Sequence, residues 1–448
     1  MIRRAEVRQL MRIRKSSLAA VCLAAACLAA LPPAARAVDP KTGRRIDQEI
    51  EKNRAAIVKI RRFLHMNPEL SNREFETARL IAATLQPLGL EVRTGVAKTG
   101  VVAVLRGAQS GPAVAVRADM DALPVEEATN LPYKSLNPGV MHACGHDVHS
   151  SVVLGAALVL NALRDALKGS VTFLFQPAEE GPPEGEDGGA DLMVREGALD
   201  DPPVGAVFGF HVWPEDVGTV LLAPGNVTAA ADTFVITVKG KGAHAARPHE
   251  GVDAVVIAAE VVTALQTIVS RAADPTDPTV VTVGTIHGGS RRNIIADRVV
   301  LEGTVRTLSE AGQKRVRSLM ESVVKSVTGI YGADYELEYK MGNPSVFNNP
   351  ELAAAMTPTL VRLLGKDRLV PWKPQMIAED FAFYAKKVPG LYFFLGVKNP
   401  TQPAMAPLHS PSFSPDERAI PLGIRILCHL VLDALESQSA QARGDAGN

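Results

Sequence analysis

Cysteine is scarce in this chain, since only Cys22, Cys27, Cys144 and Cys428 occur among 448 residues. So few cysteines cannot form the dense disulfide framework of small secreted domains, and a packed core must hold the fold. Aromatic residues make up only 5%, but 46% of the residues are hydrophobic, which excludes a disordered or fibrous chain. A charge excess of one sign is absent, because 48 Lys and Arg balance 48 Asp and Glu. We therefore expect no nucleic-acid partner.

Long hydrophobic runs are also nearly absent, and the one that stands out is Leu18 to Leu31 near the N-terminus. A basic stretch precedes it, and Ala35-Arg36-Ala37 follows it with the small-x-small pattern of a signal-peptidase site. Residues 1–37 therefore predict a signal peptide cleaved after Ala37, and a periplasmic or secreted protein. The run is shorter than the ~20 residues that span a bilayer, so we expect no membrane span. Lipid modification of Cys27 is the alternative for this segment.

The remaining chain alternates short apolar runs with amphipathic segments, which is typical of an α/β fold. Buried strands are expected at residues 101–105, 113–117, 171–175 and 206–210, with helices at 46–64, 74–88 and 150–163. From residue 232 the order becomes β-α-β-β-α-β, the order of a ferredoxin-like unit. From about residue 349 the α/β texture returns, and the tail after Ser437 is expected to be disordered. We predict a discontinuous α/β catalytic domain of residues 38–228 and 345–448, interrupted by a smaller α+β domain of residues 229–344.

Candidate metal ligands gather where the predicted strands end. Cys144 and His146 are two residues apart in a glycine-containing loop, a spacing that lets a thiolate and an imidazole bind one cation. The strand at 171–175 runs into Glu179 and Glu180, and two adjacent carboxylates are stable when a cation binds one and leaves the other as a base. His211 and His409 complete the set. From these residues alone, an exposed acidic turn and ordinary loop histidines remain alternatives.

Five blocks occur in an order that resembles a known family of metal-dependent amidohydrolases, which includes hippurate hydrolase, aminoacylases, auxin-conjugate hydrolases and aminobenzoyl-glutamate hydrolase. The blocks are Arg117 to Glu127, His142 to His149, Phe175 to Gly181, Gly240 to His244, and Leu408 to Pro411. The resemblance covers about residues 46 to 436. It implies that the metal ligands are Cys144, His146, Glu180, His211 and His409, and that Glu179 is the general base. It also implies two divalent metal ions, for which zinc, manganese, cobalt or nickel would suit the donors.

The resemblance assigns roles to four further residues. Asp121 matches a position that supports a metal ligand from behind, although a turn or helix-capping role is the alternative. His244 matches a residue that reaches the partner's active site in family dimers, which implies a homodimer formed through the smaller domain acting as a lid. Asn293 and Arg306 match positions that hold a substrate carboxylate, and for Arg306 a surface salt bridge is the alternative. Ile377 departs from the family, since many relatives have a small residue there, so we expect a reshaped pocket.

The sequence thus predicts an exported metal-dependent amidohydrolase that cleaves the amide bond of N-acyl amino acids or related conjugates. A dipeptidase or carboxypeptidase of the same fold is the first alternative. A noncatalytic binding protein is the second, and an intact base beside a full ligand set argues against it.

Overall fold

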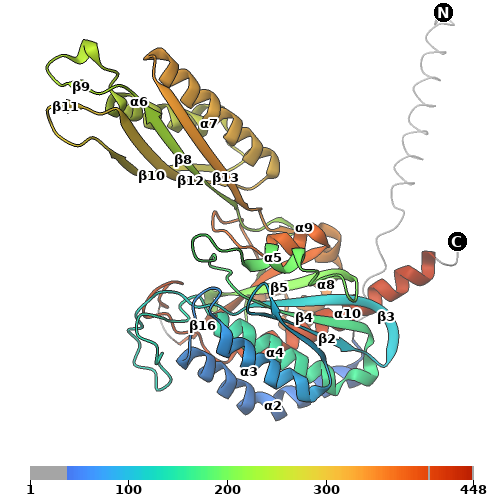
Figure 1. The fold of residues 1–448 in the computed structure, drawn as a ribbon. Coiled ribbons are helices and arrows are strands. Elements are labelled where there is room, and N and C mark those ends of the chain that lie inside the picture. The colour runs from blue at the N-terminus through green and yellow to red at the C-terminus, as the bar shows by residue number, and fades with distance from the viewer. Residues whose placement is uncertain (1–37, 402–403, 446–448) are drawn as a thin grey trace, which may run out of the picture.

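A computed structural model describes residues 38–401 and 404–445 of the chain (Figure 1). The predicted signal peptide and the lipid-modification site at Cys27 lie outside the described residues. Two separate sheets organise the described chain, one of eight strands and one of four. In Figure 1 the four-stranded unit stands away from the larger one and is joined to it by a narrow neck.

The larger sheet has the strand order β1-β2-β4-β3-β5-β16-β6-β15. Its strands are β1 (Glu91–Val96), β2 (Gly100–Arg106), β3 (Gln109–Asp119), β4 (Lys168–Gln176), β5 (Val204–Asp216), β16 (Gly390–Lys398), β6 (Val220–Leu222) and β15 (Leu369–Pro371). The central strands β4, β3, β5 and β16 are mutually parallel, whereas β1, β2 and β6 introduce antiparallel pairs. The central strands are apolar on both faces, because helices cover both sides of a parallel sheet.

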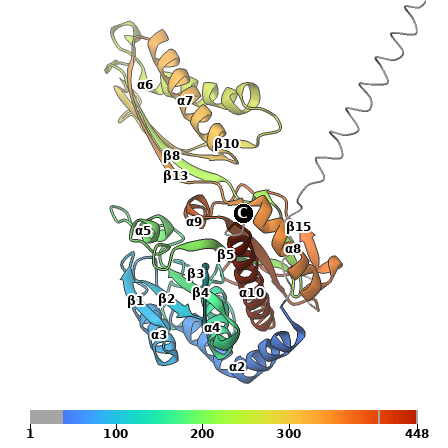
Figure 2. The same cartoon turned by 90° about the vertical axis from the view of Figure 1, so that its right-hand side faces the viewer.

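Helices cover the two faces of this sheet unequally (Figure 2). The face with the larger core packs against α2 (Pro40–Met66), α3 (Phe75–Leu85), α4 (His146–Ala162), α8 (Pro350–Leu364) and α10 (Ala419–Asp445). The short helices α5 (Gly189–Arg195) and α9 (Ala382–Lys387) belong to a second core on the opposite face, the side toward the smaller unit. Cys428 lies in the larger core, fully buried and free.

The smaller sheet has the order β10-β12-β8-β13 and is antiparallel throughout. Its elements are β8 (Ala230–Lys239), α6 (Ala254–Thr267), β10 (Thr279–Gly288), β12 (Arg298–Thr307), α7 (Glu310–Ile330) and β13 (Asp334–Asn343). Both helices pack on one face and share a core with Ile236, Leu301 and Met320. This is the β-α-β-β-α-β arrangement expected from the sequence. The predicted mixed α/β fold is confirmed, while the domain bounds and the role of this unit as a lid stay predictions.

The neck between the units is made of two chain crossings that pair with each other. The strands β7 (Gly225–Asn226) and β14 (Phe347–Asn348) form a short antiparallel pair. Beyond them, buried Asp232 accepts hydrogen bonds from Gln313 Nε2 at 2.6 Å, Tyr339 Oη at 2.6 Å and the Gly342 amide at 3.1 Å. These bonds fix the base of the smaller unit to both of its crossing strands.

Two details differ from the sequence expectations. The tail expected to be disordered after Ser437 continues α10 to Asp445, because Ala and Gln in this segment have good helix propensity. The apolar stretch Ala254–Ala272 in the smaller unit is, by length and composition alone, long enough to cross a membrane, and a third of it is buried here. The absence of a membrane span therefore stays a prediction.

Candidate metal centre and active site

The candidate ligands come together at one end of the larger sheet. Glu179 and Glu180 follow the last residue of β4, and His211 lies on the part of β5 that extends beyond its pairing with β3. Cys144 lies in the loop before α4, and His146 is the first residue of that helix. The carboxyl ends of parallel strands share one edge of a sheet, so residues distant in the sequence meet there.

Cys144 is the centre of the cluster. Its Sγ atom lies 3.2 Å from His211 Nε2 and 3.2 Å from His409 Nε2. His409 Nε2 in turn lies 3.2 Å from Glu180 Oε1, and His146 Nε2 lies 3.9 Å from Glu179 Oε2. Donor atoms from Cys144, His146 and His211 converge in one group, and those from Cys144, Glu180 and His409 in another. Two overlapping groups that share Cys144 have the arrangement of a two-ion centre.

The hydrogen bonds around the imidazoles leave lone pairs that face the cluster. His146 Nδ1 donates to the Asp121 carbonyl at 2.9 Å, and His211 Nδ1 donates to the Val212 carbonyl at 2.6 Å. When these rings are neutral, each Nε2 therefore carries the lone pair, and buried His146 Nε2 has no hydrogen-bond partner among the described residues. Within the described chain, Glu180 Oε1 is likewise buried and accepts no hydrogen bond of good geometry, although His409 Nε2 lies 3.2 Å away. A cation would satisfy both atoms, so the residues present fit divalent metal ions.

His149 lies beside this cluster but is not free to bind a cation. Its Nδ1 donates to Asp119 Oδ1 at 2.6 Å, and its Nε2 accepts from the Val212 amide at 2.9 Å. Both ring nitrogens are therefore used by the protein. The group formed by Asp119, His146 and His149 consequently supports the ligand His146 rather than forming a separate site.

The local electrostatics favour positive charge at His146. Burial lowers the pKa of His146, but Asp119 and Asp121 raise it, with a net pKa of about 10. Burial raises the pKa of the Cys144 thiol, and Glu180 and Glu179 raise it further. In the absence of metal, His146 and Cys144 therefore both hold their protons. Divalent ions would displace these protons and leave a neutral imidazole and a thiolate as ligands.

Glu179 is surrounded by carboxylates. Burial raises its pKa well above the usual range, and Glu379, Glu180 and Asp380 raise it further. One oxygen from each of Glu179, Glu379 and Asp380 lies within 4.8 Å of the others. Buried Arg117 offsets part of this charge, since its Nη2 donates to Glu379 Oε1 and Asp380 Oδ1, each at 3.0 Å. A raised pKa suits a group that must take up and release a proton during turnover.

Two non-glycine residues at the site have left-handed backbone conformations. Ala178, just before Glu179, has φ 53°, and His409 has φ 64°. Such conformations cost about 1 kcal/mol or more and are found where the surrounding structure requires them. Here the Ala178 amide donates to buried Glu74 at 2.9 Å, and the His409 amide donates to the Ala143 carbonyl at 2.9 Å. The strain turns Glu179 and the His409 ring toward the cluster.

The cluster opens into a cavity of about 680 Å³ between the larger sheet and the neck. Its apolar wall includes Trp213, Phe394 and Ile377, and Ile377 is 41% exposed. Arg306 from β12 lines the same cavity. Arg306 Nη1 donates to Thr304 Oγ1 and, at 3.1 Å, to the Val305 carbonyl, and no described carboxylate forms an ion pair with it. The surface salt bridge considered as its alternative role is therefore not formed in the described chain.

The structure brings most of the predicted site residues together but leaves two apart. Cys144, His146, Glu179, Glu180, His211 and His409 meet, with Asp121 directly behind His146 and Glu180. His244 on β9 (Ala243–His244) and Asn293 just before β11 (Ile294–Ile295) are exposed at the far end of the smaller unit (Figure 1). These two residues do not contact the cluster of their own chain.

Sequence reasoning missed the ring of charges behind the site. Asp119, Arg117 and Tyr392 were not assigned roles, although Asp119 and Arg117 lie in a block used for the resemblance. Glu379 was given no role either. Arg117 reaches Glu379 across 262 positions of sequence, so no local pattern could reveal the contact.

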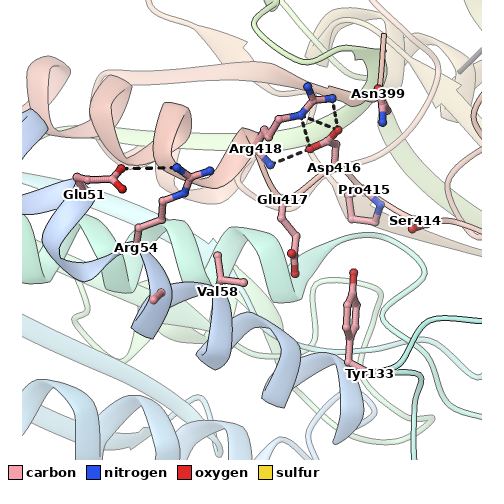
Figure 3. A pocket seen from close by; sticks show the side chains of 11 residues that line it. Glu51, Arg54, Val58, Tyr133, Asn399, Ser414, Pro415, Asp416, Glu417 and Arg418 are labelled. Carbon is pink, nitrogen blue, oxygen red and sulfur yellow. Dashed lines mark hydrogen bonds and ion pairs between the residues drawn. The ribbon is translucent and has the colours of Figure 1, made fainter. Parts of the chain in front are cut away.

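Another hollow of about 640 Å³ lies between α2, Tyr133 and the loop before α10 (Figure 3). Its charged groups are already paired, for example Arg54 with Glu51 and Arg418 with Asp416. None of the described clusters of metal-binding residues opens into it. The chemistry is therefore assigned to the cavity beside Cys144.

An α/β sheet with a convergent cluster of thiol, imidazole and carboxylate groups at its strand ends, beside a free glutamate, defines a metal-dependent hydrolase. The comparison with known families gives the same class. The chain belongs to peptidase family M20/M25/M40, which it matches over residues 115–433.

Individual relatives agree with this assignment. A protein from Synechocystis named a probable hydrolase is 43% identical over 377 residues, covering 83% of this chain and 94% of its own. A Bacillus subtilis protein named an amidohydrolase is 41% identical over 384 residues, covering 85% and 95%. An Arabidopsis thaliana IAA-amino acid hydrolase is 37% identical and covers 87% and 89%. The resemblance to amidohydrolases drawn from the sequence is confirmed.

Solved structures are also similar. A chain from methicillin-resistant Staphylococcus aureus described as an aminohydrolase has a TM-score of 0.83 at 36% identity, covering 88% of this chain and all of its own. A dinuclear metal-binding peptidase of family M20 from Bacillus subtilis has a TM-score of 0.75 at 34% identity, covering 86% and 99%. With the two ligand groups described above, this similarity confirms two divalent metal ions as the cofactor.

The predicted periplasmic or secreted location requires correction. The Synechocystis and B. subtilis hydrolases match over 94% and 95% of their own length but over only 83% and 85% of this chain. About one sixth of this chain therefore lies outside the match, whereas only about one twentieth of each relative does. The comparison with these relatives therefore does not support export of this protein.

Proposed function

We propose that this hydrolase cleaves the amide bond of N-acyl amino acids or related conjugates whose leaving group carries a carboxylate. The observation that carries the proposal is the shared cavity: Glu179 and the metal cluster lie on one wall, and Arg306, which has no ion-pair partner there, lies on another. A guanidinium binds a carboxylate through paired hydrogen bonds, which fixes the position of the amide relative to the metal centre. The apolar wall of Trp213 and Phe394 suits the acyl group.

Each residue of the cluster has a proposed role. Cys144, His146, Glu180, His211 and His409 hold two divalent ions, and Asp121 orients His146 and Glu180. When bound, such ions supply Lewis acidity that lowers the pKa of a water molecule and polarises a carbonyl. Glu179 takes the proton of the attacking water and passes it to the leaving nitrogen. His146 Nε2 is 3.9 Å from Glu179 Oε2, so the base lies beside one of the residues that would hold the ions.

The smaller unit is proposed to act as a lid and as the surface of a homodimer. Helix α6 exposes Val255 and Val256, 46% and 50% of whose surfaces are accessible, and β10 is an edge strand with one described neighbour. Exposed apolar side chains next to an open strand edge suit a second copy of the chain. His244 and Asn293 would then reach the site of the partner subunit, His244 toward the oxyanion and Asn293 toward the substrate carboxylate.

A carboxypeptidase that removes an amino acid from an N-blocked peptide is the second candidate. A thermostable carboxypeptidase from Saccharolobus solfataricus is 41% identical to this chain, whereas an N-acetyl-L-cysteine deacetylase from Bacillus subtilis is 40% identical. Both reactions leave a free carboxylate for Arg306 to bind. Only the group on the other side of the amide distinguishes them.

The test is a substrate panel measured with metal-reconstituted enzyme and with Glu179→Gln. The panel contains N-acetyl, N-benzoyl and N-indoleacetyl amino acids, N-blocked dipeptides and free dipeptides. We expect hydrolysis of N-acyl amino acids, abolished by Glu179→Gln with metal content unchanged, because this substitution removes a base and no ligand. Loss of metal together with activity would mean that Glu179 and Glu180 have exchanged roles. Cleavage of peptides alone would favour the carboxypeptidase.

A further inference from the structure

Glu379 lines the catalytic cavity, but it is neither a proposed metal ligand nor the proposed base. It precedes Phe381 in the loop between β15 and α9, and only 3% of its surface is exposed. Its Oε1 accepts from Arg117 Nη2 at 3.0 Å and from the Phe381 amide at 2.8 Å, and its Oε2 accepts from the Tyr392 hydroxyl. A carboxylate offers about four acceptor positions. Three donors therefore fix this one rigidly and leave one acceptor position.

The position of Glu379 relative to Glu179 is the second observation. An oxygen of each lies within 4.8 Å of the other, and both residues line the cavity. Hydrogen bonds to nitrogen are about 2.9 Å long, so one nitrogen can contact both oxygens at once. At that separation the two oxygens subtend an angle of up to about 110° at the nitrogen, which matches tetrahedral geometry.

The scissile nitrogen must come to this place. Glu179 can protonate the nitrogen only from hydrogen-bond distance. During amide hydrolysis the nitrogen becomes tetrahedral, so its lone pair and its N–H bond point in different directions. If the lone pair points toward Glu179, the N–H bond can point toward Glu379.

We propose that Glu379 is a catalytic residue that accepts a hydrogen bond from the N–H of the scissile amide and so turns the nitrogen lone pair toward Glu179. This role rests on the proposed function. When the C–N bond breaks, its electron pair stays on nitrogen, which takes the proton held by Glu179. Glu379 neither gains nor loses a proton in this step. Arg117 and Tyr392 act through Glu379 as positioning residues.

The consequence is a selectivity for amides over esters that resides in one side chain. A site built to bind an N–H discriminates against an analogue without it, because its acceptor is left unpaired. An ester oxygen has no hydrogen to offer Glu379. Removal of this acceptor should therefore impair amide hydrolysis and spare ester hydrolysis.

The test compares N-benzoylglycine with its ester counterpart O-benzoylglycolate, using wild type, Glu379→Gln and Asp380→Asn. In Glu379→Gln the new amide oxygen can accept from Arg117 and the Phe381 amide, and the new amide nitrogen can donate to the Tyr392 hydroxyl, so the fold should survive. We expect Glu379→Gln to lower kcat for the amide by about 10- to 100-fold, the value of a hydrogen bond to a charged group, with little change for the ester.

Asp380→Asn is the matched control. Asp380 is also buried, held by Arg117 at 3.0 Å and near Glu179, but it does not line the cavity. Asp380→Asn removes the same negative charge as Glu379→Gln, but it leaves the acceptor on Glu379 in place. Any effect of Asp380→Asn should therefore be equal for the amide and the ester. Metal content and thermal unfolding of all three proteins identify damage to the site or fold.

Binding gives a readout without turnover. Calorimetry with a phosphonamidate and the matching phosphonate ester, which differ only in N–H against O, should show about 10- to 100-fold tighter binding of the N–H compound by wild type. This preference should be lost in Glu379→Gln and retained in Asp380→Asn. An equal loss on both substrates, or an unchanged phosphonamidate preference in Glu379→Gln, would overturn the role of Glu379. Failure of wild type on every N-acyl amino acid would instead overturn the proposed function and this role with it.

Discussion

Glu74 is a buried carboxylate whose removal should stabilise the metal-free protein at neutral pH. The side chain is fully buried, and burial raises its pKa to about 7, with a further contribution from Asp121. Its Oε1 accepts from the Ala178 amide at 2.9 Å and its Oε2 from Thr99 Oγ1 at 2.6 Å. These two donors do not offset the loss of hydration. The charged form of Glu74 is therefore unfavourable in the folded state.

The sign and size of the effect follow from the difference between the folded and unfolded pKa. In the unfolded chain Glu74 titrates near its ordinary pKa of 4.5, whereas in the folded chain it titrates near 7. Between these values the folded state binds more protons, so stability falls as pH rises through this window. A difference of this size corresponds to about 3 kcal/mol. The Glu74→Gln protein, which cannot ionise here, should lack this loss.

The assay is urea unfolding of metal-stripped protein at intervals from pH 4.5 to 8. In Glu74→Gln the new side chain can accept from the Ala178 amide with its oxygen and donate to Thr99 with its nitrogen, so the local structure should persist. We expect Glu74→Gln to match wild type at the acidic end and to exceed it by about 3 kcal/mol above pH 7. Glu76→Gln, at an exposed position in the first turn of α3 just after Glu74, is the control and should not reproduce the gain in stability above pH 7. Parallel curves for wild type and Glu74→Gln would refute the reasoning.

Two further predictions concern the metal ligands and the lid. Asp121→Ala should lower metal affinity by about 10- to 100-fold, measured by competition with a chelator. The reason is that it removes the carboxylate that accepts hydrogen bonds from Ser71 and from the Glu180 amide. An unchanged affinity would limit Asp121 to a role in the turn. His244→Ala and Glu179→Gln homodimers should each be inactive. Mixing them should restore part of the wild-type rate, about 10²- to 10³-fold above the His244→Ala background. In the mixed dimer, the Glu179→Gln subunit supplies His244 to the site of the His244→Ala subunit, whose Glu179 is intact. Subunit exchange without recovered activity would exclude a role of His244 in trans.

The central strands and long helices could be predicted from the sequence because their apolar patterns are strong. The expected strand at 171–175 lies within β4 (Lys168–Gln176), and the expected helix at 46–64 lies within α2 (Pro40–Met66). The short strand β15 (Leu369–Pro371) escaped prediction, because an edge strand with exposed residues carries little pattern. The end of α10 was misplaced, because residues 436–440 are only partly buried or exposed and carry no apolar periodicity.

The candidate site was partly predictable for a different reason. Cys144 and His146 are close in sequence, and Glu179 and Glu180 follow a recognisable strand, so local spacing sufficed to nominate them. The arginine that balances the acidic groups could not be found in this way, because Arg117 on β3 meets Glu379 only through the tertiary fold. The position of His244 was equally hidden, since a loop sequence does not show which end of a domain it occupies.

The charge balance of the site connects its stability with its chemistry. Asp119, Asp121, Glu179, Glu180, Glu379 and Asp380 crowd around the cluster, and Arg117 is the one described arginine that pairs with them. Such an excess of buried carboxylates is unfavourable unless cations bind or protons are taken up. Divalent ions would relieve it at Glu180, but Glu179 would remain beside the fixed acceptor Glu379. The same crowding that makes the metal-free site hold protons therefore gives the metal-bound site a base with a high affinity for the proton it must transfer.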